Sequence, residues 1–145
     1  MEEIVYLQTT FAGEYRERII DLRYEVYVHE QKVPVELEID EHDEQALHLV
    51  ALLGGQVVGT ARLVQGEDHL RVGRMAVKKP LRQKGVGSRL LEIALDFARQ
   101  GGYQKVVLDS QVRAVKFYER YGFMPEGDFF DDAGIPHVRM VLTLG

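Results

Sequence analysis

A basic stretch with two glycines, near the middle of the chain, has the residue types of an anion-binding loop. It comprises Arg82, Gln83, Lys84, Gly85, Val86, Gly87 and Ser88. It opens a predicted helix, whose first backbone amides have no partner within the helix and whose dipole adds partial positive charge there. Gly85 and Gly87 would let a phosphate approach the backbone without meeting a Cβ atom. The stretch therefore suggests a pyrophosphate site.

Two other phosphate-binding motifs do not match this stretch. A Walker loop ends in Gly-Lys-Ser/Thr, a run that is absent here. A dinucleotide-binding fingerprint needs a third glycine at the position of Leu90. The glycines and bases could equally serve only to start a surface helix, so the loop alone leaves both interpretations open.

The composition excludes several other kinds of site. The chain has no cysteine, which excludes disulfides, thiolate metal sites and cysteine nucleophiles. Its 5 histidines show no paired spacing of the His-x-x-x-His kind, so no metal is expected. The 18 basic and 23 acidic residues give a net charge of -5, which does not fit a nucleic-acid-binding surface.

The location expected from the sequence is the cytoplasm. No run of about 18 apolar residues occurs, so no transmembrane helix and no membrane partner are expected. The chain begins Met-Glu-Glu, where a signal peptide would be basic. The lack of cysteine is consistent with a reducing compartment.

The elements that position the loop follow from hydrophobic spacing along 145 residues, which we expect to form one domain, 1–145. Strands are predicted over 4–9, 46–53, 56–64, 70–77, 105–109, 124–130 and 137–144. Helices are predicted over 11–28, 85–100 and 112–121, and turns at 54–55, 66–68 and 131–136. The order β-α-β-β-β-α-β-α-β-β predicts an α/β or α+β fold, with a mixed, mostly antiparallel sheet flanked by helices.

Two motifs resemble those of the GCN5-related N-acetyltransferase (GNAT) superfamily. Residues 82–87 resemble its acyl-CoA loop, Arg/Gln-x-x-Gly-x-Gly/Ala, between the central strand and a long helix. Residues 111–123 resemble its Asn-x-x-Ala-x-x-Phe-Tyr-x-x-x-Gly-Phe signature, with Gln111 in place of Asn. A narrower resemblance, to the ElaA-like branch, rests on Glu30, Gln31, Glu38, Asp40, His48, residues 59–62, Phe117, Tyr118 and residues 134–137.

The resemblance implies the GNAT fold and an activity. The activity is transfer of an acetyl or other short acyl group from acyl-CoA to a primary amine on a small molecule or a protein. The residues that it places at acetyl-CoA are Met75, Ala76, Val77, Arg82, Gln83, Lys84, Gly85, Val86, Gly87, Ser88, Gln111 and Phe117. Tyr118 takes the place of the family's general acid, which protonates the departing thiolate.

The general base is less well defined. Some relatives carry a glutamate on the central strand where this chain has Arg71. His137 and Glu41 are candidate bases, and so are His48 and Asp43, each acting directly or through water. Ordered water acting alone is an equal alternative.

An acidic segment, residues 36–44, allows three interpretations. A run of this kind is most often a solvated loop. It could also form a mouth that attracts a cationic amine. Thirdly, Arg23, Asp40, Asp43 and Arg62 weakly resemble the ion-pair cluster that organises the substrate side of acyl-homoserine-lactone synthases.

Two alternatives to an acyl-CoA-dependent amine acetyltransferase stay open. One is a degenerate GNAT domain that binds acyl-CoA without turnover. The other is a synthase that takes its acyl group from an acyl-carrier protein. The resemblance also allows a homodimer, because related proteins often pair.

Overall fold

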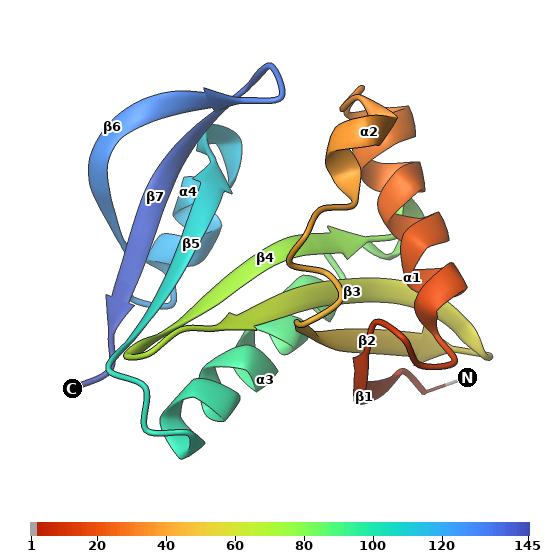
Figure 1. Ribbon diagram of the computed structural model, residues 1–145, viewed down its shortest axis with the longest axis horizontal. Coiled ribbons are helices and arrows are strands. Elements are labelled where there is room, and N and C mark those ends of the chain that lie inside the picture. Colours follow the sequence, from red (N-terminus) through yellow and green to blue (C-terminus); the bar gives the residue numbers. More distant parts are fainter. Residues whose placement is uncertain (1–2) are drawn as a thin grey trace.

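A seven-stranded sheet forms the centre of the computed structural model, which describes residues 3–145 (Figure 1). The strands are β1 (Val5–Thr10), β2 (Leu47–Leu53), β3 (Gln56–Gln65), β4 (His69–Val77), β5 (Lys105–Gln111), β6 (Met124–Asp132) and β7 (Ile135–Thr143). They lie in the order β1-β2-β3-β4-β5-β7-β6. The neighbours β4 and β5 are parallel and the other pairs antiparallel, which confirms the predicted mixed, mostly antiparallel sheet.

The helices confirm the predicted element order. They are α1 (Arg16–Arg23), the π-helix η1 (Tyr24–Glu30), α2 (Val35–Glu38), the 3-10 turn η2 (Lys79–Leu81), α3 (Val86–Gln100), the 3-10 turn η3 (Val112–Ala114) and α4 (Val115–Glu119). The helix predicted over 11–28 is wrong at its start. Residues 11–15 form turns in which Phe11 packs into the core, and α1 begins only at Arg16. No helix within residues 3–145 is long and apolar enough to span a membrane.

Helices cover both faces of the sheet. Strands place successive side chains on opposite faces, so Leu49 of β2 joins the core under α3 and Val50 joins the core under α1. The α3 side is closed by Leu90 and Leu91, which are fully buried. The sheet therefore lies between α1 and α3, with a core on each face (Figure 1).

The strands β4 and β5 separate part-way along their length. They pair through His69, Leu70 and Arg71 of β4 and then diverge (Figure 1). The second half of β4 therefore has an open edge on the side of β5. This divergence, rather than a loop, makes room for a site inside the sheet.

The last two strands form a longer hairpin than predicted. The turn expected over 131–136 is reduced to Ala133 and Gly134, which have φ angles of 52° and 82°. Two successive residues with positive φ are typical of a tight hairpin turn that matches the twist of the strands. As a result His137 lies within β7, and Asp132 ends β6.

Candidate active site

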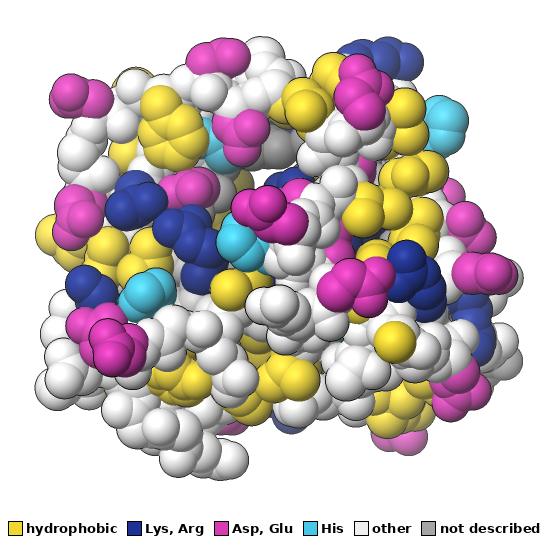
Figure 2. Space-filling view, viewed as in Figure 1, with side chains coloured by type: hydrophobic (Ala, Val, Ile, Leu, Met, Phe, Trp, Pro, Cys, Tyr) yellow, Lys and Arg dark blue, Asp and Glu magenta, His cyan; other side chains and the backbone are white. Residues whose placement is uncertain are grey.

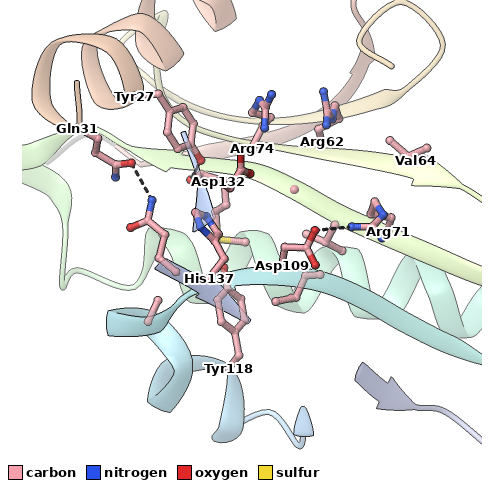
Figure 3. Close-up of a pocket in the computed structure, with 16 residues that line it drawn as sticks. Tyr27, Gln31, Arg62, Val64, Arg71, Arg74, Asp109, Tyr118, Asp132 and His137 are labelled. Atoms are coloured by element: carbon pink, nitrogen blue, oxygen red, sulfur yellow. Dashed lines mark hydrogen bonds and ion pairs between the residues drawn. The ribbon is translucent and has the colours of Figure 1, made fainter. Parts of the chain in front are cut away.

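A cavity that Tyr118 and His137 both line, called the main cavity below, opens where β4 and β5 diverge (Figure 3). It has a volume of about 240 Å³. Its lining residues are Tyr27, Gln31, Arg62, Val64, Arg71, Val72, Gly73, Arg74, Met75, Leu108, Asp109, Gln111, Ala114, Tyr118, Asp132 and His137. The surface is hollowed between the β6–β7 hairpin and α2, and basic, acidic and histidine side chains border the hollow (Figure 2).

A bulge in β4 lies at the wall of this cavity. The pairing of β3 with β4 shifts between Thr60 and Arg62. Opposite this shift Arg74 has φ = 44°, a left-handed conformation that is uncommon outside glycine. The next residue, Met75, lines the cavity, and its carbonyl accepts a hydrogen bond from the Tyr27 hydroxyl. Since bulges re-aim the backbone, this one can direct a peptide group of β4 at a ligand.

Tyr118 reaches the cavity from α4. Its ring packs edge-on against Phe117 and Phe123, at centroid distances of 5.0 and 5.9 Å. Burial raises the pKa of the Tyr118 phenol to about 12, and no hydrogen bond contributes to this shift. The phenol is therefore protonated at neutral pH and can act only as a proton donor.

His137 reaches the same cavity from β7 and stacks on Phe130, with ring centroids 5.9 Å apart. Its Nδ1 lies 2.7 Å from the Ile135 carbonyl. A carbonyl oxygen only accepts, so Nδ1 carries the proton of the neutral ring and Nε2 keeps its lone pair. His137 therefore has the tautomer that a general base needs.

The predicted anion loop borders a second cavity, of about 550 Å³. Gly85 ends the loop with φ = 87°, a conformation that favours glycine. The Arg89 amide donates to the Gly85 carbonyl in the first hydrogen bond of α3. The backbone amides of residues 86–88 therefore have no partner within the helix. The lining residues are Val77, Arg82, Gln83, Gly85, Gly87, Ser88, Phe117 and Arg120.

The two cavities are lined by neighbouring residues of β4 and α4. Val77 and Phe117 line the loop cavity, whereas Met75 and Tyr118 line the main cavity. Val77 and Met75 are two residues apart and so lie on one face of β4. An extended ligand anchored at the loop has a path along the open edge of β4 to the point where Tyr118 and His137 meet.

Two of the predicted acyl-CoA contacts have partners within the protein. Arg82 donates to the Val77 carbonyl and pairs with Glu30, and the hydrogen bond from Arg82 lowers the pKa of Glu30. Gln111 donates to Gln31 at 2.7 Å, which ties β5 to the end of η1 (Figure 3). Either side chain would have to exchange this partner to bind a ligand.

The remaining predicted acyl-CoA contacts differ in how exposed their side chains are. Ala76 and Val86 are 2% and 1% exposed, so they can offer only backbone groups. Lys84 is exposed on the loop, where its ammonium group can approach an anion. Arg120, which the sequence pattern did not single out, adds a guanidinium group to the loop cavity.

The prediction of a solvated acidic loop holds for Glu36, Glu41 and Glu44, which are exposed, and is wrong for Glu38 and Asp43, which are buried. The same burial makes the prediction of an open acidic mouth wrong. Arg23 lies 2.7 Å from Asp43 and 2.8 Å from Glu38, and all three side chains are 1% exposed. Arg62 joins Asp43 to Asp40, at 3.2 and 2.6 Å. These ion pairs hold the acidic segment against α1 and β3, as the third interpretation expects.

Arg74 connects this ion-pair cluster to the cavity. Its guanidinium lies 3.0 Å from Glu38 and 3.1 Å from Asp40. The cluster thus holds the side chain of the residue whose backbone forms the bulge. Asp40, Asp43 and Arg62, predicted for the substrate side, support the β4 wall of the cavity through their ion pairs.

Three of the candidate bases lie away from the cavity. The Glu41 side chain is 87% exposed and lies beside His42. Asp43 is committed to its buried ion pairs. His48 is fully buried, and burial lowers its pKa. Their assignment as bases is therefore corrected, because a base must reach the reacting amine directly or through one water.

The Asp43→Asn substitution is expected to destabilise the protein by about 3–5 kcal/mol at pH 7, because it leaves Arg23 without a full partner in the interior. Burial alone would raise the pKa of Asp43, but the hydrogen bonds and charge of Arg23 bring it to about 2. Denaturant unfolding measures the loss.

Acid provides the second half of this test. The lowered pKa means that Asp43 contributes stability above about pH 4, which is lost as the pH falls towards 2. The variant should therefore depend less on pH in that window. Glu44→Gln, which removes an exposed partner of Arg16, is the control and should cost less than about 1 kcal/mol. Equal costs for the two variants would contradict the account.

Several cavity residues were not predicted from the sequence. Tyr27, Asp109 and Asp132 come from η1, β5 and β6 and meet only in the folded chain. Asp109 gave one signal, since it ends the predicted strand 105–109 and binding residues often lie where a strand gives way to a loop, although β5 continues to Gln111. Within residues 3–145, no group of three or more His, Cys, Asp or Glu side chains is arranged to hold a metal.

Comparisons with known sequences match the chain to one family. Residues 11–144 match the family model described as an acetyltransferase (GNAT) domain. The chain is 37% identical to the uncharacterized N-acetyltransferase YjcF of Bacillus subtilis over 83% of this chain and 86% of that protein. It is 29% identical to protein ElaA of Escherichia coli over 84% and 83% of the two chains.

Solved structures show the same fold. An acyl-CoA N-acyltransferase from Pseudomonas aeruginosa superposes with a TM-score of 0.87 and 30% identity, over 96% of this chain and 99% of that one. Escherichia coli ElaA superposes with a TM-score of 0.86 and 24% identity, over 94% and 98%. A CoA-dependent acyl-homoserine lactone synthase, BjaI, reaches 0.79 with 17% identity, over 99% and 84%, which is a likeness of fold.

Proposed function

Because the chain belongs to the ElaA-like branch of the GNAT superfamily of acyltransferases, we propose that it acylates a primary amine. The donor is acetyl-CoA or another short acyl-CoA, and the acyl group passes directly between two reactants bound together. The observation that carries this proposal is the line of two cavities along the open edge of β4, with the anion loop at one end and Tyr118 and His137 at the other.

The loop cavity has the space and the donors for the pyrophosphate of acyl-CoA. A Cβ atom added at Gly87 would lie 3.8 Å from Val77 and 3.9 Å from Met75, so a ligand can approach the backbone there. The free amides at the start of α3 would bind phosphate oxygens, and Lys84 and Arg120 would add charge. The β4 backbone from Met75 to Val77 would bind the amide groups of the thioester arm as an added strand.

Three groups then have chemical roles. The Met75 amide would donate to the thioester oxygen, where negative charge develops. His137 Nε2 would accept the proton that the amine loses, directly or through one water. Tyr118 would donate its proton to the sulfur that leaves. Its raised pKa makes it a weak acid, but the same apolar surroundings also raise the proton affinity of an uncompensated thiolate.

The assay of this proposal is acetylation of small primary amines, followed by release of free CoA thiol and by the mass of the product. Turnover that depends on both acetyl-CoA and an amine supports it. Binding of acetyl-CoA without turnover of any amine would instead identify the non-catalytic module. Turnover with an acylated carrier protein alone would identify the carrier-dependent synthase.

His137→Gln is expected to lower kcat about 10²-fold, at the low end for loss of a general base, because water can partly replace it. Steady-state kinetics measure the loss. His69→Gln, at a surface pair with Asp68, is the control and should leave kcat unchanged. An unaltered kcat in His137→Gln would assign the base to water.

The cytoplasmic location, the single-domain organisation and the homodimer stay predictions. The mass of the protein in solution tests the homodimer.

A further inference from the structure

The main cavity contains an arginine with unused hydrogen-bond donors. Arg71 lies at its closed end, where β4 and β5 part, and the side chain is 33% exposed. Its Nη1 lies 3.1 Å from Asp109, which is its carboxylate partner within residues 3–145. Since a guanidinium has five N–H groups, donors remain for a second carboxylate.

The other two arginines of the cavity wall each pair with two carboxylates, although the buried Nε of Arg62 has no hydrogen-bond partner within the described residues. Arg62 lies within 3.2 Å of two carboxylates, those of Asp40 and Asp43. Arg74 bonds the carboxylates of Glu38 and Asp40 and also the Glu38 carbonyl. Their charges are therefore neutralised within the protein, and Arg71 is the cation that the cavity offers to a ligand.

The acidic side chain without a partner lies elsewhere in the cavity. Asp132 ends β6 beside the β6–β7 turn, and the ion pairs around the cavity in the described residues do not include it. Figure 3 shows Asp132 near His137 and Tyr27, while Arg71 and Asp109 lie together to one side. An ammonium group can therefore be attracted to Asp132 and deprotonated by His137, with Arg71 left for another group.

We propose that the acceptor is an amino acid, that is, a small amine that also carries a carboxylate, and that Arg71 binds this carboxylate. The inference rests on the acyltransferase function proposed above and names its substrate class. A cavity of about 240 Å³ suits a molecule of amino-acid size. A polyamine would instead bring a second positive charge to Arg71, which like-charge repulsion disfavours.

The test compares amines that differ only by the carboxylate. Glycine, β-alanine, γ-aminobutyrate and L-leucine are assayed with acetyl-CoA beside methylamine, ethylamine, propylamine and isoamylamine. The series varies the distance between the amine and the carboxylate. For at least one pair, the amino acid should have a kcat/KM about 10- to 100-fold higher, the gain expected from charge-assisted hydrogen bonds.

The variants assign that gain to a residue. Arg71→Gln should remove the preference for the amino acid over its matched plain amine, whereas Arg71→Lys should keep part of this preference. Asp132→Asn should lower kcat/KM for both the amino acid and its matched amine, because Asp132 attracts the ammonium group that both molecules carry. Asp109 also lies 3.6 Å from Arg139. The Asp109 carboxylate therefore keeps a positively charged partner when Arg71 is replaced by Gln. Thermal unfolding shows whether each variant folds.

The outcomes separate this inference from the proposed function. Turnover of the plain amines at rates equal to or above those of the amino acids would overturn the substrate class and keep the acyltransferase. Acetyl-CoA binding with no turnover of any amino acid would also overturn the class. A preference that survives in Arg71→Gln would overturn the role of Arg71. Failure to bind acetyl-CoA at all would instead overturn the function on which the inference rests.

Discussion

The Gly87→Glu substitution is expected to abolish binding of acetyl-CoA while the protein stays folded. The added Cβ atom meets only ordinary contacts, 3.8 and 3.9 Å from Val77 and Met75, so the fold has room for it. A carboxylate in the first turn of α3 is also favourable to the helix dipole. It would, however, occupy the free amides and repel the phosphates, so the same charge that suits the helix excludes the ligand. Calorimetric titration measures the loss.

Two variants at the same position separate charge from bulk. Gly87→Gln has the size of the glutamate without its charge and should retain weak binding, whereas Gly87→Ala should bind nearly as the parent protein does. If Gly87→Glu bound acetyl-CoA as tightly as the parent, the phosphates would not rest at the start of α3, and the loop would only begin a helix.

The Tyr118→Phe substitution is expected to lower kcat about 10²- to 10⁴-fold with little change in the KM for acetyl-CoA. The ring remains and keeps its edge-on contacts with Phe117 and Phe123. The phenol, whose pKa is raised to about 12 by burial, is protonated at neutral pH in the parent. Loss of this proton donor leaves the thiolate to depart with its full charge. Steady-state kinetics give kcat and KM separately.

Tyr121→Phe is the matched control. Tyr121 packs against Phe117 at 5.6 Å in the same aromatic group, outside the cavity lining. It should therefore leave kcat unchanged. Equal losses of kcat in the two variants would indicate a packing role for both hydroxyl groups. An unaltered kcat in Tyr118→Phe would show that Tyr118 is a structural residue and not the general acid.

The anion loop was predictable because its signal is local. Glycines, bases and the start of an amphipathic helix lie within a few residues of one another, and the folded chain keeps them together from Arg82 to Ser88. The order of the elements along the chain was predictable for a similar reason, since the hairpin turns are marked by glycines. The Gly54 and Gly55 turn, for example, joins β2 to β3 where it was expected.

The bulge of β4 and the π-helix η1 were not predictable in this way. Both depend on contacts between distant residues, such as the bond from Tyr27 to the Met75 carbonyl and the ion pair of Arg74 with Glu38. Sequence spacing indicates a strand or a helix, but it does not show where tertiary contacts distort one. These distortions lie at the cavity, where local rules are most often broken.

The acidic segment shows the same limit for electrostatics. The sequence displays its charge, and a run of acids usually faces solvent. The partners come from other elements: Arg23 and Arg62 pair with Asp43, which is buried, and Arg74 pairs with Glu38 and Asp40. The carboxylate at the cavity without an ion pair among the described residues is instead Asp132, the last residue of β6.

Calorimetric titration of the purified protein with acetyl-CoA and with free CoA tests the central claim most directly. We predict one site per chain for each ligand, with micromolar affinity. Free CoA should retain most of the binding energy, because the loop binds its phosphates and the edge of β4 binds its arm. Absence of binding by both ligands, in protein shown to be folded, would contradict the assignment of the two cavities as an acyl-CoA site.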